Sequence, residues 1–315
     1  MRTFRLPATL LSFLLVSRAG AALSAPPPPL DHAPLVRERA AAYLKPDDLV
    51  LGVEIGGDAR AYPLAILERH GVANDTIGRI PVALAWCRPC GSAVAYRTDT
   101  PKGTLTLAVS GKLRDGQPLL GDRQTGTLWN PLTGTPVEGA LAGLRLQLQP
   151  LPVVLTTWTR WFQSHLESRV LAQETAPQGA EAQPGSEPAG PWVYGVTAGG
   201  ATKAYPVDLV AKLGVIDDEI GGRPVVVVAE PGADPKGRTI RVYDRGDRVF
   251  SRSGHSFLGA SFVNDQGGRA WKIGEEALTI TDGQTRARIP GKLAVQAAWV
   301  AAYPGAVVWA EPKTP

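Results

Sequence analysis

The chain contains one stretch of sequence twice, and this internal repeat most constrains the fold that it can adopt. Residues 50–82 and 193–225 superpose at a constant offset of 143 positions without a gap. The matched residues of the first copy are specific ones, namely Gly52-Val53, Gly56-Gly57, Ala61-Tyr62-Pro63, Gly71-Val72, Asp75, Ile77-Gly78 and Pro81-Val82. A weaker match at an offset of 138 pairs Trp161 with Trp299. We therefore expect two related halves that pack as a pseudo-two-fold duplicated unit.

Each copy of the repeat predicts the same local elements. Residues 49–55 and 59–64 are apolar and flank Gly56-Gly57, which predicts a β-hairpin. One or two helical turns over 65–70 and a strand over 80–86 follow, with turns marked by Asn74-Asp75 and Gly78. The predicted fold class is α+β and mainly β.

Composition divides the chain into five regions. Two arginines, an apolar run over 6–16 and small residues at 19–22 predict a signal peptide over 1–25, because the run is shorter than the roughly 20 residues of a spanning helix. Residues 26–46 are expected to form a Pro-rich spacer and a short helix (35–44). The repeat halves are expected at 47–171 and 192–315, joined by a low-complexity linker over 172–191. The protein is thus expected to be exported, either periplasmic or secreted, without a stable membrane span once the leader is removed.

The charge of the chain argues against a nucleic-acid partner. Removal of the leader takes away Arg2, Arg5 and Arg18 but no acidic residue, so the formal net charge falls from +4 to +1. The remaining chain has no clustered basic stripe with interleaved aromatic residues, which a nucleic-acid binder needs. We therefore expect no nucleic-acid binding.

Cysteines occur only in the first copy, where Cys87 and Cys90 lie just beyond the repeat match. Two thiols at this spacing in an exported protein could form a disulfide, a redox couple or half of a metal site. The run from Trp86 to Cys90 matches the active-site pattern of thioredoxin-like oxidoreductases. However, residues 93–97 have strand character where those proteins have a helix, so a tight loop between two strands is expected instead.

A metal site at the cysteines would need further ligands. A C-x-x-C-G knuckle supplies two thiolates, whereas a closed zinc site has four ligands. His70, His165, His255, Asp75 or Asp122 would have to converge on the pair. Thiolate and imidazole would also suit Cu(I). A structural disulfide at the strand turn remains the plain alternative.

Several other residues are candidates for the site. Leu213 replaces His70 in the second copy, as expected for a residue that accompanies the cysteines. Asp75 is matched by Asp218, which favours a role in a turn, while Asn74 is matched by Asp217. Asp122-Arg123 recurs as Asp244-Arg245 and predicts either a turn or an ion pair that lines a cleft. Trp129 could cover the site or lie in the core. The chain has no G-x-S-x-G, H-E-x-x-H or G-x-x-x-x-G-K-[ST] motif.

The combined pattern resembles the bacterial family catalogued as domain of unknown function 3179. It includes Gly52 to Pro63, Cys87-x-x-Cys-Gly91, Asp122-Arg123-x-Thr125 and Thr133-Gly134. The resemblance covers about Asp47 to the C-terminus and implies an exported or membrane-associated bacterial protein without stating a biochemical role. Carried over position by position, the family motif falls on His70, Asn74, Asp75, Cys87, Cys90, Asp122, Arg123 and Trp129. The chain departs from the family pattern in Arg88-Pro89 between the cysteines and in the absence of Tyr at position 121.

Two functional hypotheses follow. The first is a metal-binding or redox-active dithiol protein, in which Cys87, Cys90 and His70 form the site and Cu, Zn, Fe or no metal is bound. Asn74, Asp75, Asp122, Arg123 and Trp129 are then candidates to line a cleft. The second is a non-catalytic module that binds a small ligand or a periplasmic protein, with a permanently oxidised cysteine pair.

Overall fold

The computed structural model describes residues 28–32, 34–88, 90–114, 117–173, 190–230, 234, 238–257 and 259–312. Within these residues the protein is mainly β, with several sheets and four short α-helices. The predicted signal peptide and most of the predicted linker lie outside the described residues. In the described ranges no helix is long and apolar enough to cross a membrane.

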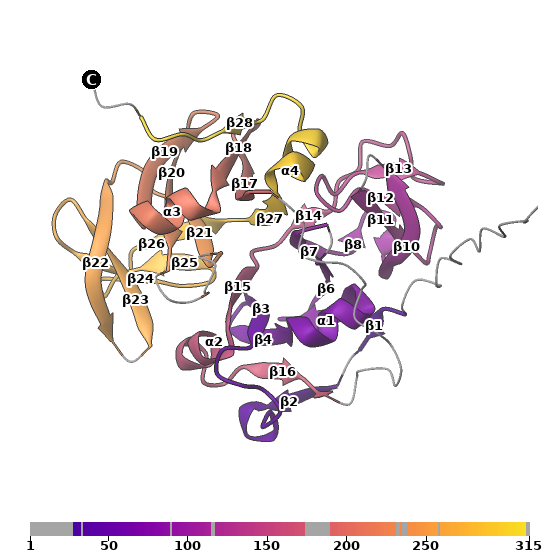
Figure 1. Cartoon of the computed structure of the whole chain (residues 1–315), viewed down its shortest axis with the longest axis horizontal. Coiled ribbons are helices and arrows are strands. Elements are labelled where there is room, and N and C mark those ends of the chain that lie inside the picture. Colours follow the sequence, from indigo (N-terminus) through magenta and orange to yellow (C-terminus); the bar gives the residue numbers. More distant parts are fainter. Residues whose placement is uncertain are drawn as a thin grey trace, which may run out of the picture.

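The largest sheet combines strands from both halves of the chain. Its strands are β1 (Leu30–Asp31), β5 (Val72–Ile77), β6 (Ile80–Cys87), β7 (Ser92–Arg97), β14 (Gln149–Pro150), β17 (Trp192–Ala198), β18 (Ala201–Pro206), β27 (Gly291–Val295) and β28 (Val307–Val308). The order is β1-β5-β6-β7-β27-β17-β18-β28, and β14 pairs with β7 (Figure 1). β7 of the first half and β27 of the second half are antiparallel neighbours, with Leu293 opposite Ala93. The two halves therefore share one sheet.

The structure contains two further large sheets. A five-stranded sheet has the order β15-β3-β4-β16-β2, formed by β15 (Val154–Thr157), β3 (Leu49–Ile55), β4 (Asp58–Pro63), β16 (Arg169–Leu171) and β2 (Leu35–Arg37). An eight-stranded sheet has the order β19-β20-β21-β26-β25-β24-β23-β22. Its strands are β19 (Val215–Ile220), β20 (Arg223–Ala229), β21 (Ile240–Asp244), β22 (Phe250–Phe257), β23 (Ala260–Asp265), β24 (Ala270–Ile273), β25 (Ala277–Thr279) and β26 (Thr285–Ile289).

Two small sheets complete the described structure. One contains β10 (Leu107–Arg114), β11 (Gln117–Asp122), β12 (Leu128–Trp129) and β13 (Pro136–Glu138), and the other contains β8 (Asp99–Thr100) and β9 (Gly103–Thr104). The β10–β13 sheet and the β22–β23 hairpin lie toward opposite ends of the long axis (Figure 1).

The repeated sequence forms the same series of elements in both copies. Each copy has a hairpin, then a seven-residue helix, then a second antiparallel pair; the helices are α1 (Leu64–His70) and α3 (Val207–Leu213). Later in each half, a strand leads into α2 (Trp158–Ser164) or α4 (Gln296–Ala302), followed by the closing strand β16 or β28. The predicted hairpins, the helix over 65–70 and the strand over 80–86 are confirmed within about two residues at each end.

A glycine on the first hairpin strand lets the later helix pack directly against that strand. The ring of Trp161 on α2 occupies the place where a Cβ atom of residue 52 would lie, and Trp299 on α4 does the same at Gly195. Both tryptophans are buried. Glycine at these two positions is therefore a packing requirement of the fold.

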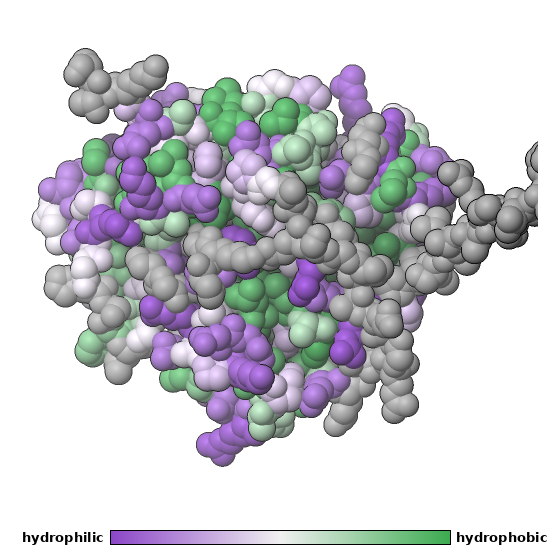
Figure 2. Space-filling view, in the orientation of Figure 1, coloured by the Kyte–Doolittle hydropathy of each residue, from purple (hydrophilic) through white to green (hydrophobic). Residues whose placement is uncertain are grey.

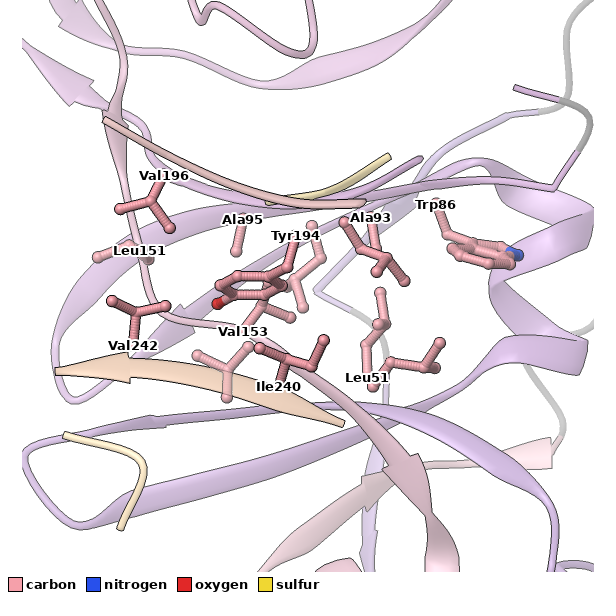
Figure 3. Packing of buried hydrophobic residues seen from close by; sticks show 14 of the residues in the cluster. Leu51, Trp86, Ala93, Ala95, Leu151, Val153, Tyr194, Val196, Ile240 and Val242 are labelled. Carbon is pink, nitrogen blue, oxygen red and sulfur yellow. The ribbon is translucent and has the colours of Figure 1, made fainter. Parts of the chain in front are cut away.

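One buried hydrophobic cluster connects the two halves. Figure 3 shows its side chains facing one another, including Leu51, Trp86, Ala93, Ala95, Leu151 and Val153 from the first half and Tyr194, Val196, Ile240 and Val242 from the second. Burial of apolar surface contributes about 25 cal/mol per Å², so this shared cluster stabilises the association of the halves. On the face in Figure 2, hydrophobic and hydrophilic residues are interspersed.

Two local predictions differ from the structure. The segment predicted as a helix over 35–44 instead forms β2 and the 3₁₀ helix η1 (Glu38–Ala40). β2 pairs with β16, and these interstrand hydrogen bonds favour the extended form of a segment too short to be a stable helix alone. Asn74 and Asp75, predicted to mark a turn, lie within β5; the turn follows at Gly78, with Arg79 at a φ of 67°.

Candidate functional site

The two cysteines lie at the junction of β6 and β7. Cys87 is the last residue of β6, and Cys90 lies in the turn before β7. Their sulfur atoms are at disulfide distance and their Cα atoms are 5.3 Å apart, within the range of a disulfide. Gly91, with a φ of 58°, donates its backbone N–H to the carbonyl of Arg88 at 3.0 Å and closes the turn. The predicted tight loop between two strands is confirmed.

The two sulfur atoms have different environments. Cys87 is partly exposed, whereas Cys90 is buried. The backbone N–H of Cys90 donates to the Sγ atom of Cys87 at 3.2 Å. A donor at this position stabilises a thiolate on Cys87 when the bond is open. Cys87 is thus the sulfur that an external thiol reaches more easily.

A buried carboxylate on α1 fixes the residues on both sides of Cys87. Glu68 Oε1 accepts hydrogen bonds from Arg88 Nε at 2.8 Å and from Trp86 Nε1 at 3.4 Å. Arg88 Nη2 lies 2.6 Å from the same oxygen, so the bond is also an ion pair. The glutamate is 6% exposed, while the Arg88 side chain is 43% exposed. This network ties the strand end to α1.

Glu68 is a site residue that the sequence analysis missed, although the repeat contains its signal. The position that matches Glu68 in the second copy is Ala211, and Arg88 is matched by Pro231. These residues differ between the copies in the same way as the cysteines. The loss of Glu68 in the cysteine-free copy is thus a sequence signal of the kind that singled out His70.

His70 ends the helix that precedes β5, the strand paired with β6. It is the last residue of α1, it is buried, and its Nδ1 atom is 2.8 Å from the carbonyl oxygen of Pro28. Trp86 donates its backbone N–H to the carbonyl of Gly71 at 3.0 Å. His70 directly precedes Gly71 in the chain, and Cys87 directly follows Trp86. The structure therefore brings His70 to the cysteine end of β6.

The described ranges contain no group of three or more His, Cys, Asp and Glu side chains that could hold a metal ion. Three or four such ligands are typical of protein zinc sites. In the disulfide form the two sulfur atoms are bonded to each other and are not thiolates. The chemistry that this geometry supports is that of the sulfur pair.

Asn74 and Arg123 belong to a separate polar network at the edge of the large sheet. The side chain of Asn74 exchanges hydrogen bonds with the backbone of Leu107 at 2.9 Å and donates to Asp31 Oδ1 at 2.9 Å. Arg123 forms an ion pair with the same aspartate. This network connects β1, β5 and the β10–β13 sheet, and it holds the N-terminal described segment in place.

Asp75 connects β5 to the hairpin. Its Oδ2 atom accepts hydrogen bonds from Tyr62 OH at 2.5 Å and Arg60 Nη1 at 2.9 Å. Burial, followed by the Asp75 charge, raises the pKa of Tyr62 well above its ordinary value. In the second copy Asp218 binds Tyr205 and Lys203 in the same way, at 2.9 Å each. The occurrence of this contact in both copies indicates a role in the scaffold.

Asp122 and Trp129 form a third, buried unit in the β10–β13 sheet. Trp129 Nε1 donates to Asp122 Oδ2 at 2.9 Å, and Thr125 donates its backbone N–H to Oδ1 at 2.6 Å. Both residues are buried. Of the predicted site residues, the structure pairs Cys87 with Cys90 and places His70 at the end of α1, where its Nδ1 atom contacts Pro28, while the others lie in three separate networks.

Comparison with known proteins places the chain within one family. Residues 27–184, about half of the chain, match the family described as "Protein of unknown function (DUF3179)". No curated protein and no solved structure gives a match. The matched segment contains the first copy of the repeat with Cys87, Cys90, Glu68 and His70. The protein belongs to the DUF3179 family.

Proposed function

We propose that Cys87 and Cys90 form a reversible disulfide that exchanges electrons with dithiol partners. The observation that carries this proposal is the asymmetry of the closed pair, with Cys87 partly exposed and Cys90 buried. Such an arrangement directs an incoming thiolate to one sulfur and keeps the other as an internal leaving group. A structural disulfide needs no such difference.

The second copy supports a role beyond bracing the fold. Its strands β19 and β20 form the same antiparallel pair as β5 and β6, yet the positions of the cysteines hold Glu230 and Ala233. A bridge across so short a loop also removes little conformational entropy from the unfolded chain. The disulfide is therefore not required for this pair of strands to form.

The exchange reaction balances as a transfer of two electrons. A thiolate of the partner attacks Cys87 Sγ, the Cys87–Cys90 bond breaks, and Cys90 leaves as a thiolate that takes up a proton. The second thiolate of the partner then attacks the partner sulfur of the mixed disulfide and releases Cys87 as a thiolate. The partner dithiol is oxidised to a disulfide and the cysteine pair is reduced. The N–H of Cys90 stabilises the Cys87 thiolate, while the charge of Arg88 is neutralised by Glu68.

The reduction potential of the pair tests this function. We expect equilibration with glutathione buffers to give a potential above about −300 mV, because structural disulfides of secreted proteins typically lie below that value. A lower potential would contradict the redox function and would mean that the bridge is permanent, as the second hypothesis requires.

Variants at Glu68 test whether the network around Cys87 tunes the exchange. Glu68→Gln leaves the Arg88 guanidinium without its carboxylate, so the thiolate of Cys87 gains a nearby unneutralised charge. We expect the unneutralised positive charge of Arg88 to lower the pKa of the Cys87 thiol and therefore to raise the reduction potential of the pair. Asp218→Asn, which breaks the polar contact of the second copy, is the control and is expected to leave the potential unchanged. Equal reduction potentials in the wild type, Glu68→Gln and Asp218→Asn would contradict a role for Glu68.

The proposal includes an exported protein with a duplicated architecture. An oxidising compartment keeps such a pair available as a disulfide, in agreement with the predicted leader at 1–25. The duplication is supported by reciprocal contacts between the halves. β27 pairs with β7, and in the opposite sense Thr239 Oγ1, beside β21, donates to the carbonyl of Leu155 on β15 at 2.7 Å. Leu293 and Leu155, which take part in these contacts, are matched positions of the repeat.

A further inference from the structure

A cavity lies between α2 of the first half and the β22–β23 hairpin of the second half. It has a volume of about 190 Å³ and is separate from the cysteine site. Ser164 on α2 donates to the carbonyl of Gly259 at 3.2 Å, so the helix and the end of the hairpin are in contact (Figure 1). The cavity therefore lies at the contact between the two halves.

The repeat explains why there is space at this place. Gly214, Val215, Val228 and Ala229 line the cavity, and they match Gly71, Val72, Ala85 and Trp86 of the first copy. In the first copy the large indole of Trp86 packs against α1 at the equivalent strand end. The second copy has a methyl group there. The same location in the scaffold thus carries a disulfide site in one half and a cavity in the other.

The positively charged side chains that line the cavity favour an anionic ligand. Two arginines line it, Arg160 from α2 and Arg252 from β22, and among the described residues that line it none is acidic. The Arg252 guanidinium lies against Gly214, where an added Cβ atom would overlap it, and it donates to the carbonyl of Lys212 at 3.5 Å. Guanidinium groups bind carboxylate and phosphate oxygens through paired hydrogen bonds.

The rest of the lining contains apolar side chains, and the cavity is small. Val215, Val228 and Val263 supply apolar surface, and Ser261, which also lines a second cavity of about 100 Å³, donates its hydroxyl to Glu230 Oε1 at 2.8 Å. Drug-sized ligands occupy pockets of roughly 300–1,000 Å³, so the occupant must be smaller. We infer that this cavity binds a small organic anion, whose carboxylate or phosphate lies between Arg160 and Arg252 and whose apolar part faces the three valines.

The first test compares a branched carboxylate with its neutral analogue. Isothermal titration of the full chain with 3-methylbutanoate, and separately with inorganic phosphate, should give saturable binding of at least one anion. 3-Methylbutanamide, which has the same apolar part without charge, should bind at least tenfold more weakly than the carboxylate. Binding of the amide as tight as that of the carboxylate, or no binding of either anion up to 10 mM, would overturn the inference.

Arginine variants locate the site. Arg252→Gln and Arg160→Gln should each weaken anion binding about tenfold or more, whereas Arg114→Gln on β10 should bind as the wild type does. Unaltered affinity in both cavity variants would also overturn the inference. Because the cavity does not depend on the sulfur pair, the double variant Cys87→Ser, Cys90→Ser should retain the wild-type affinity, so failure of the redox proposal and failure of this one are distinguishable.

Discussion

At the scale of single residues, the second copy of the repeat lacks the residues found around the cysteines. Glu68, His70, Trp86 and Cys87 are replaced in the second copy by Ala211, Leu213, Ala229 and Glu230. By contrast, the aspartate that binds the hairpin tyrosine is kept in both copies. The residues around the cysteines thus differ between the copies, whereas this scaffold contact is kept.

A buried lysine gives the protein a pH-dependent stability. Lys292 on β27 is 7% exposed, and it donates to the carbonyl of Leu132 and to Tyr303 OH. Burial lowers its pKa from 10.5 to about 7. Between these two values the unfolded chain holds a proton that the folded chain has lost. The free energy of unfolding should therefore rise with pH across this window, by at most about 1.4 kcal/mol per unit from this group.

Lys292→Met should remove this dependence. Tyr303 OH still donates to the carbonyl of Leu132 at 2.7 Å, so the variant leaves no unpaired acceptor there. We expect the stability of the variant relative to wild type to be greatest below pH 7 and to decline toward pH 10, measured by urea unfolding. Lys112→Met, at a 59% exposed side chain, is the control. A constant difference between variant and wild type at pH 6 and pH 10 would contradict the assigned cause.

At the scale of elements, one contact fixes how each helix packs on its hairpin. Trp161 lies over Gly52 and Trp299 over Gly195, and each tryptophan is 1% exposed. In both cases the rings lie closer to the backbone than any residue with a Cβ atom permits. The helix position is thus determined by a glycine far away in the sequence.

Gly52→Ala and Gly195→Ala should each destabilise the fold. The added methyl group must displace a buried indole, and overpacking of this kind costs about 1–3 kcal/mol or more. Gly103→Ala is an informative control for backbone effects, because its φ of +106° is strained for alanine but nothing lies near its Cβ position. We expect the two packing variants to lower the thermal midpoint more than this control does; an equal loss in all three would refute the packing argument.

At the scale of the whole molecule, buried ion pairs lie where the halves meet. Glu275 binds Arg241 and Arg288, and Arg288 Nη2 donates to the carbonyl of Val153 in the first half at 2.9 Å. Burial alone would raise the pKa of Glu275, but the two arginines lower it from 4.5 to about 2. The folded state therefore releases this proton more readily than the unfolded chain does.

This pKa predicts how acid destabilises the protein. The contribution of Glu275 is fully present above about pH 4.5 and is lost as the pH falls toward 2; it amounts to about 3 kcal/mol. Glu275→Gln should lower the free energy of unfolding by about 3–5 kcal/mol at pH 7, because it leaves two arginines poorly compensated. Near pH 2.5 the difference from wild type should shrink. Glu138→Gln, at a 60% exposed side chain, should change stability by less than about 0.5 kcal/mol.

The sequence alone determined the local elements of the repeat. Apolar segments on either side of paired glycines predicted the hairpins, and the strand predicted over 80–86 indicated that the cysteines lie in the loop after it. These features depend on neighbouring residues, so local physics is sufficient for them. The same reasoning failed over 35–44, because β16, whose pairing makes that segment extended, is more than 120 residues away.

Only the tertiary structure decided which distant residues meet. The pairing of β7 with β27, the burial of Glu68 under Arg88, and the separation of Asn74, Asp75 and Asp122 into different networks depend on long-range packing. The cavity between Arg160 and Arg252 arises in the same way, since the two residues come from different halves. Side-chain pairs so far apart in the chain leave no periodic signal in sequence, because their contact energy appears only when the core brings the elements together.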